Sequence, residues 1–158
     1  MTEERDEVLP PEMKEKLEKL RRNYIRKPDG KGGYVIEEAE LLVWAEWFED
    51  SFEDRLIKRT DFPDGSHLST IFLGIDHNWG FDDPRPILWE TMFFKKLDEP
   101  KMLDFFGSKR EMTHDGIYEW RWHSEEDAAK AHAFISSRLV DDINADLSEY
   151  DPLEIKTR

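Results

Sequence analysis

The sequence contains no cysteine. Disulfide bonds, thiolate nucleophiles and zinc or iron–sulfur centres held by cysteine are therefore excluded. It also lacks any apolar run near the roughly 20 residues that cross a bilayer. Its first residues are acidic and polar, unlike a secretory signal. These absences predict a cytoplasmic protein that has no membrane partner.

Basic residues are scarce relative to acidic ones: 23 Lys and Arg stand against 37 Asp and Glu, which gives a net charge of −14. Direct binding to nucleic acid through a basic surface is therefore disfavoured. Residues 37–54 hold eight acids and no base. One interpretation is a solvated surface that keeps the protein soluble. The other is an acidic surface that meets a basic partner and imitates DNA, for which the candidate residues are Glu46, Glu49, Asp50 and Glu53.

The length of 158 residues predicts one folded domain with flanking segments. Residues 1–33 are expected to form a charged N-terminal extension, with a helix over 12–26 and a Gly-rich joint at 28–33. Residues 34–140 are expected to form a single α+β domain. Residues 141–158 are acidic and interrupted by Pro152, which predicts a partly ordered tail.

Two further helices are predicted from apolar residues at helical spacing. The first spans residues 38–53 and places Leu41, Trp44, Ala45, Phe48 and Phe52 on one face, with Trp47 at its flank. The second starts after Ser124, whose hydroxyl suits an N-cap. Its predicted buried face consists of Ala128, Ala131, His132, Ile135 and Leu139.

Strands are predicted over residues 55–60, 67–75, 87–94 and 117–123, with a turn over 61–66. In the last strand Tyr118, Trp120 and Trp122 share one face. Residues 102–106 are compatible with a short helix or an added strand, and His114-Asp115-Gly116 is a hairpin signal. The sum is an α+β fold: an antiparallel sheet of about three to five strands, two helices packed on one face, and an added N-terminal helix.

Four phrases of the sequence resemble a family of small uncharacterised proteins encoded by phages and prophages. They are LLVWAEWFE from residue 41, STIFLGIDHNWG from residue 69, PILWETMFF from residue 86 and YEWRWHSEEDA from residue 118. The resemblance covers residues 34–135. The chain departs from the family in its N-terminal extension and in residues 95–116, where the family has a short glycine-rich turn. The resemblance implies a bacterial host cell and a counter-defence or host-takeover setting, without a mechanism.

The predicted loop over residues 76–86 is long for a connection between strands, which makes it a candidate binding loop. Its candidate binding residues are Asp76, His77, Trp79, Phe81 and Arg85. Asp76, His77 and Glu90 are weak candidates for a divalent metal, with His123 and His132 nearby. The alternative is structural: Asp76 and Asn78 organise a turn, Glu90 pairs with Arg85, Arg121 or another base, and His132 is a hydrogen-bonded core histidine.

Three functional hypotheses follow. The first is a non-enzymatic protein that inhibits a host component, such as a defence nuclease, through its acidic surface. The second is sequestration of a nucleotide signal by Arg55, Arg59, Arg85 and Arg121. The third is a metal-dependent hydrolase that uses Asp76, His77 and Glu90. The sequence favours the first, with a host protein as partner, no cofactor and no catalytic residue; a homodimer is left open.

Overall fold

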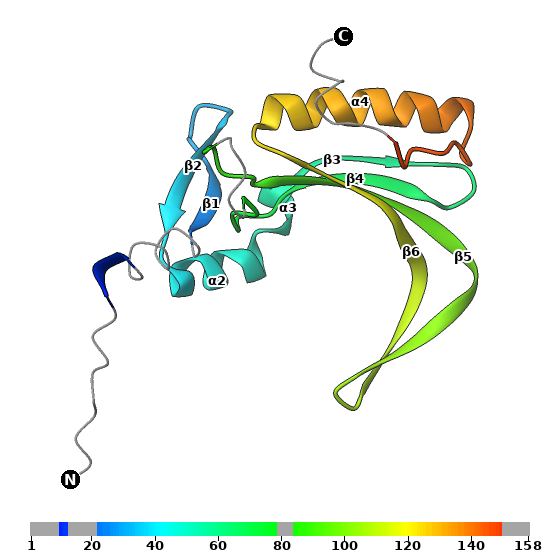
Figure 1. Cartoon of the computed structure of the whole chain (residues 1–158), viewed down its shortest axis with the longest axis horizontal. Coiled ribbons are helices and arrows are strands. Elements are labelled where there is room, and N and C mark those ends of the chain that lie inside the picture. The colour runs from blue at the N-terminus through cyan, green and yellow to red at the C-terminus, as the bar shows by residue number, and fades with distance from the viewer. Residues whose placement is uncertain (1–9, 13–21, 79–83, 150–158) are drawn as a thin grey trace.

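A four-stranded antiparallel sheet with the strand order β3-β4-β5-β6 forms the centre of the fold (Figure 1). Its strands are β3 (Leu56–Asp61), β4 (His67–Phe72), β5 (Trp89–Phe105) and β6 (Ser108–Trp122). A second, two-stranded antiparallel sheet consists of β1 (Asn23–Pro28) and β2 (Tyr34–Ala39). The computed structural model describes residues 10–12, 22–78 and 84–149. The predicted α+β class is confirmed.

The core lies on one face of the four-stranded sheet, where side chains in register form rows across the strands. Phe72 pairs with Trp89, which pairs with Trp122, and Leu68 pairs with Phe93. All five side chains are buried. The predicted alternation in residues 117–123 is confirmed, because Trp120 and Trp122 are buried and Tyr118 packs against them. Since successive side chains of a strand alternate between faces, Glu90, Glu119 and Arg121 lie on the other face of the sheet.

Helix α4 (Glu125–Asp141) covers that core face. Ser124 caps it, since its hydroxyl accepts a hydrogen bond from the Asp127 backbone N–H over 3.1 Å. The buried residues of α4 are the five that the sequence predicts, Ala128, Ala131, His132, Ile135 and Leu139. The chain then turns back, and Leu147 is also buried in the core. Residues up to 149 therefore continue the packed structure beyond the helix.

The predicted helix over residues 12–26 is not confirmed. Residues 13–21 lie outside the described residues, and from Asn23 the chain is a strand, not a helix. Residues 29–33, assigned to a joint from the sequence, form the turn between β1 and β2. The Asp29 carboxylate accepts the backbone N–H groups of Lys31 and Gly33 over 2.7 and 3.0 Å. For residues 23–26, hydrogen bonding to β2 overrides the helical spacing of the apolar residues.

The helix predicted over residues 38–53 begins later and is divided, because β2 extends to Ala39. It forms α2 (Leu41–Asp50) and the short α3 (Phe52–Arg55). Helix α2 packs against β1, so the prediction of two helices on one face of the main sheet is not confirmed. Figure 1 shows α2 below β1 and β2, away from α4. No helix in the described part of the chain is long and apolar enough to cross a membrane.

Strands β5 and β6 extend far beyond the rest of the sheet as a curved hairpin (Figure 1). Residues 102–105 belong to β5, so the added-strand alternative is correct. The hairpin predicted at His114-Asp115-Gly116 is wrong, because those residues lie inside β6. The chain reverses at Phe106 and Gly107, since Phe105 pairs with Ser108. We refer to residues 95–115 as the hairpin arm.

Candidate functional site

The connection from β4 to β5, which contains the predicted binding loop, is fixed at its start to β1. The Tyr24 backbone N–H donates to the Gly74 carbonyl over 2.6 Å, and Asn23 forms an antiparallel bridge to Ile75. Gly74 has a φ of +75°, and a Cβ there would lie 2.5 Å from the Tyr24 carbonyl oxygen. Only glycine avoids both the strain and the collision. The N-terminal hairpin is therefore joined to the first residues of this connection.

Asp76 organises this loop through its carboxylate. Its Oδ1 accepts the backbone N–H groups of Asn78 over 2.8 Å and Ile87 over 2.9 Å. The Asn78 side-chain amide donates to the Arg85 carbonyl over 2.7 Å. These bonds join the two described ends of the loop. The structural interpretation of Asp76 and Asn78 is thus confirmed. The Oδ1 atom of Asp76 already accepts two backbone hydrogen bonds.

The histidines beside the loop are also bound to its backbone. His77 Nδ1 lies 2.8 Å from the Ile75 carbonyl, and His123 Nδ1 lies 2.9 Å from the Arg85 carbonyl. Because a carbonyl oxygen only accepts, each Nδ1 carries a proton and donates. The backbone of Arg85 receives bonds from Asn78 and His123, while the Arg85 residue is exposed. The predicted anchors Trp79 and Phe81 fall outside the described residues.

Glu90 lies on the face of the sheet opposite α4 and is buried there. Its carboxylate accepts a hydrogen bond from Arg121 Nε over 3.3 Å, as the structural interpretation predicts. Arg121 also pairs with Glu119. Burial raises the pKa of the Glu90 carboxyl, the negative charge of Glu119 raises it further, and the bond from Arg121 opposes the rise. The three side chains form a charged cluster that is structural within the sheet.

His132 is fully buried between α4 and the main sheet. Its Nε2 lies 2.8 Å from the Thr60 hydroxyl, and its Nδ1 lies 2.8 Å from the Thr70 hydroxyl. Thr70 in turn bonds Thr91, which accepts from the Trp122 indole N–H over 3.0 Å. Burial and then the charge of Lys58 lower the pKa of His132 to about 4. His132 is thus the hydrogen-bonded core histidine that the sequence suggested.

Three of the arginines proposed as phosphate contacts, Arg55, Arg59 and Arg121, contact other groups. The Arg55 guanidinium lies 3.8 Å from the centre of the Phe48 ring, and Arg59 pairs with Asp61 over 2.9 Å. Arg121 pairs with Glu90 and Glu119. Arg59 and Arg121 lie on β3 and β6, the two opposite edge strands of the main sheet. A phosphate at Arg59 or at Arg121 would therefore have to displace an existing ion pair, and these two arginines lie at separate places.

The acidic residues of α2 and α3 lie at the surface. We call Glu46, Glu49, Asp50 and Glu53 the acidic face, and all four are exposed. None of the residues of α2 is fully buried. The half-buried side chains are Trp44, Ala45, Trp47 and Phe48, so the inner side of the helix includes Trp47 and not the exposed Leu41 or Phe52. The Trp47 indole N–H donates to the Arg26 carbonyl over 3.1 Å and its ring contacts Phe72, which fixes α2 to the core.

The outer side of α2 also carries exposed apolar residues. Leu42 is 79% exposed, Leu41 59% and Val43 50%. Residues 42, 46 and 49 follow the i, i+4, i+7 spacing that places side chains on one side of a helix. Leu42 therefore lies beside Glu46 and Glu49. An exposed leucine among carboxylates was not predicted from the sequence, because the predicted apolar face did not include Leu42 and no role was assigned to that residue.

Two other residues were not singled out from the sequence. Arg26, assigned to a helix, is a buried arginine of β1 that bonds Glu125 and the Asp54 carbonyl. Phe106, at the end of the hairpin arm, is fully exposed. The Phe-Gly pair at 106–107 is a weak turn signal, since the favoured residue before glycine in such a turn is Asn or Asp.

No group of three or more histidine, aspartate or glutamate side chains among the described residues is arranged to hold a metal ion. The metal-dependent hydrolase thus gains no support from Asp76, His77 and Glu90. Comparison of the chain with known protein families, with curated proteins and with solved structures gives no match.

Proposed function

We propose that this protein acts by binding another protein through the acidic face, without catalysing a reaction. The observation that carries the proposal is the outer surface of α2, where Leu42 is 79% exposed and lies beside exposed carboxylates. Together with the exposed Leu41 and Val43, Leu42 forms an apolar patch bordered by charged residues, which is the type of surface that marks protein interaction sites. A helix held by Trp47 presents this surface on a fixed support.

The negative charge of this surface indicates the charge that the partner should carry. Residues 37–54 contain eight acids and no base, so the field over the helix is strongly negative. The acids of β2 are near bases, since Glu37 pairs with Lys27 over 2.8 Å and Glu38 lies 4.0 Å from Arg22. The acidic face lies on the neighbouring helices instead. A partner with a basic surface and an apolar recess fits it, and electrostatic attraction would speed their association.

The resemblance to phage and prophage proteins favours a host component as that partner. A defence nuclease binds DNA phosphates with a basic surface, and carboxylates on a helix can occupy such a surface in place of phosphates. The protein would then inhibit the host component by competing with DNA. Asp76, His77 and Glu90, the candidates for metal chemistry, form hydrogen bonds to backbone groups or to Arg121. These structural roles favour binding over catalysis.

The test compares two variants with the same change in net charge. The first reverses the acidic face with Glu46→Lys, Glu49→Lys, Asp50→Lys and Glu53→Lys. The control reverses four exposed acids of the hairpin arm, Asp98, Glu99, Glu111 and Asp115. Each tagged protein is used to capture host proteins, which are then quantified by mass spectrometry. We expect a basic protein that wild type and control retain and the face variant loses.

Binding is then measured with that purified protein. The face variant should raise the dissociation constant at least tenfold, and added salt should weaken wild-type binding. Leu42→Asn should weaken binding without changing the charge. Equal binding by the face variant and the arm control, or insensitivity to salt, would reject the acidic face as the contact surface.

A further inference from the structure

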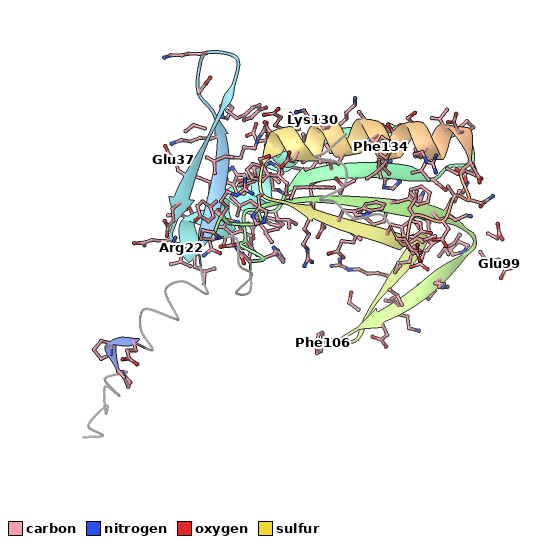
Figure 2. The ribbon with its side chains drawn as sticks, turned by 45° about the horizontal axis from the view of Figure 1, so that its top comes forward. Arg22, Glu37, Glu99, Phe106, Lys130 and Phe134 are labelled. Atoms are coloured by element: carbon pink, nitrogen blue, oxygen red, sulfur yellow. The ribbon has the colours of Figure 1, made fainter. Side chains whose placement is uncertain are left out.

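The tip of the hairpin arm carries an aromatic residue in an unfavourable backbone conformation. Phe106 has a φ of +50° and Gly107 a φ of +87°, and they form a two-residue loop because Phe105 pairs with Ser108. Loops of this type favour Asn-Gly, since a bulky residue at positive φ is strained. The Phe106 side chain is also fully exposed. Figure 2 shows it at the end of the arm, well apart from α4.

The tip is basic although the protein is strongly acidic. The paired residues 101–112 contain Lys101, Lys109 and Arg110 against two acids, Asp104 and Glu111. The Asp104 carboxylate accepts the Gly107 backbone N–H over 2.9 Å, so it stabilises the turn. Met102 adds a second apolar side chain, which is 62% exposed. The tip therefore combines an exposed phenyl ring with positive charge.

A pocket of the complementary kind lies between the turn after β3 and the end of α4. Its volume is about 470 Å³. Its apolar lining includes Phe62, Leu139, Val140 and Ile143, and its acidic lining is Asp64, Asp141 and Asp142. None of its lining residues is basic, and the negative end of the α4 dipole adds to the potential of the three carboxylates.

We propose that the tip of one molecule inserts Phe106 into this pocket of a second copy, where Lys109 and Arg110 meet the aspartates. Three observations select a second copy as the occupant: the tip has an apolar end with positive charge, the pocket has an apolar lining with negative charge, and one chain carries both. The tip projects away from α4, so the arm presents the ring to another molecule (Figure 2). Two molecules can exchange arms and close a symmetric dimer, or the contact can continue as a chain.

The contact is small, so association in the micromolar to millimolar range is expected. Sedimentation velocity of the full chain up to roughly 1 mM should show concentration-dependent association that weakens as salt is added. Phe106→Asn, at the tip, and Val140→Lys, at the pocket, should each raise the dissociation constant at least tenfold. Val140 is 71% exposed, so its replacement leaves the core intact. Leu42→Asn, which also removes an exposed apolar side chain, should associate like wild type.

Two measurements separate the contact from a general effect on folding. Asn suits positive φ, so the urea midpoint of Phe106→Asn should equal or exceed that of wild type. An equal mixture of Phe106→Asn and Val140→Lys should associate again, because the first keeps the pocket and the second keeps the tip. A wild-type chain that stays monomeric at every concentration, variants that associate unchanged, or a mixture that stays monomeric would each overturn the proposal.

Discussion

Arg26 Nε donates a hydrogen bond to Glu125 Oε1 over 2.7 Å, between residues 99 positions apart. The same guanidinium donates to the Asp54 carbonyl over 2.7 Å and lies 3.4 Å from the centre of the Tyr34 ring. Arg26 is 6% exposed. One buried cation therefore connects β1, β2 and α3 with the first turn of α4, where the helix dipole favours the carboxylate of Glu125.

Replacement of Arg26 by Met should lower the free energy of unfolding by about 2 to 3 kcal/mol, because two hydrogen bonds of a buried charged group are lost. The side chain of Glu125 is 40% exposed and regains water, which limits the loss. Lys27→Met is the matched control: Lys27 pairs with Glu37, both side chains are about half exposed, and its loss should cost under about 1 kcal/mol. Equal urea denaturation curves for the two variants would contradict this role of Arg26.

Gly74→Ala should destabilise the protein much more than Gly30→Ala. Both glycines have positive φ, +75° and +77°, so both substitutions introduce backbone strain of about 1 kcal/mol. A Cβ at Gly74 would also lie 2.5 Å from the Tyr24 carbonyl oxygen and 2.6 Å from Trp44 Nε1, whereas nothing lies within 4 Å of one at Gly30. We expect a further loss of about 2 kcal/mol or more at Gly74. Thermal and urea unfolding of both variants measure the difference, and equal losses would show that the close approach is relieved without cost.

His132 should make folding stability depend on pH in the acidic range. Its pKa falls from 6.5 to about 4 on folding, chiefly through burial, so the folded state binds fewer protons than the unfolded state between these values. The contribution of the neutral ring is complete above about pH 6.5 and is lost as the pH falls toward 4. The total is on the order of 3 kcal/mol.

The measurement compares wild type with His132→Gln by urea denaturation across this range. Glutamine can bond both threonines but does not titrate. The stability of wild type relative to the variant should therefore decline as the pH is lowered from 6.5 to 4. A constant difference between the two proteins would mean that His132 accepts a proton in the folded state without penalty.

Glu119→Gln should lower the pKa of Glu90. Burial raises the pKa of the Glu90 carboxyl first, and the charge of Glu119 raises it second, while both carboxylates pair with Arg121. Without the Glu119 charge, Arg121 is left to Glu90 and the ionised form is favoured. Carboxyl carbon chemical shifts followed by NMR titration report this pKa directly. An unchanged or higher value in Glu119→Gln would remove Glu119 as a cause.

Local sequence patterns determined the parts of the fold in which helical spacing or strand alternation decides whether each side chain is buried. Ser124 and the helical spacing from Ala128 to Leu139 predicted the start and the buried face of α4 correctly. Alternation predicted the burial of Trp120 and Trp122. The loop roles of Asp76 and Asn78 also followed from sequence, since such side chains bond backbone groups two residues away.

Strand pairing and packing that periodicity does not reveal decided the rest. Residues 23–28 became strand because β2 supplies a partner on one side and the Gly74 region, which is distant in sequence, supplies one on the other. The hairpin arm depends on the pairing of residues 101–105 with 108–112, and this pairing sets the turn at Phe106 despite its strained backbone. The burial of Arg26 likewise requires α3 and α4 to meet around it. The sequence by itself therefore determined the elements whose pattern is local, and tertiary structure decided which of the remaining polar and aromatic residues are buried and which face solvent.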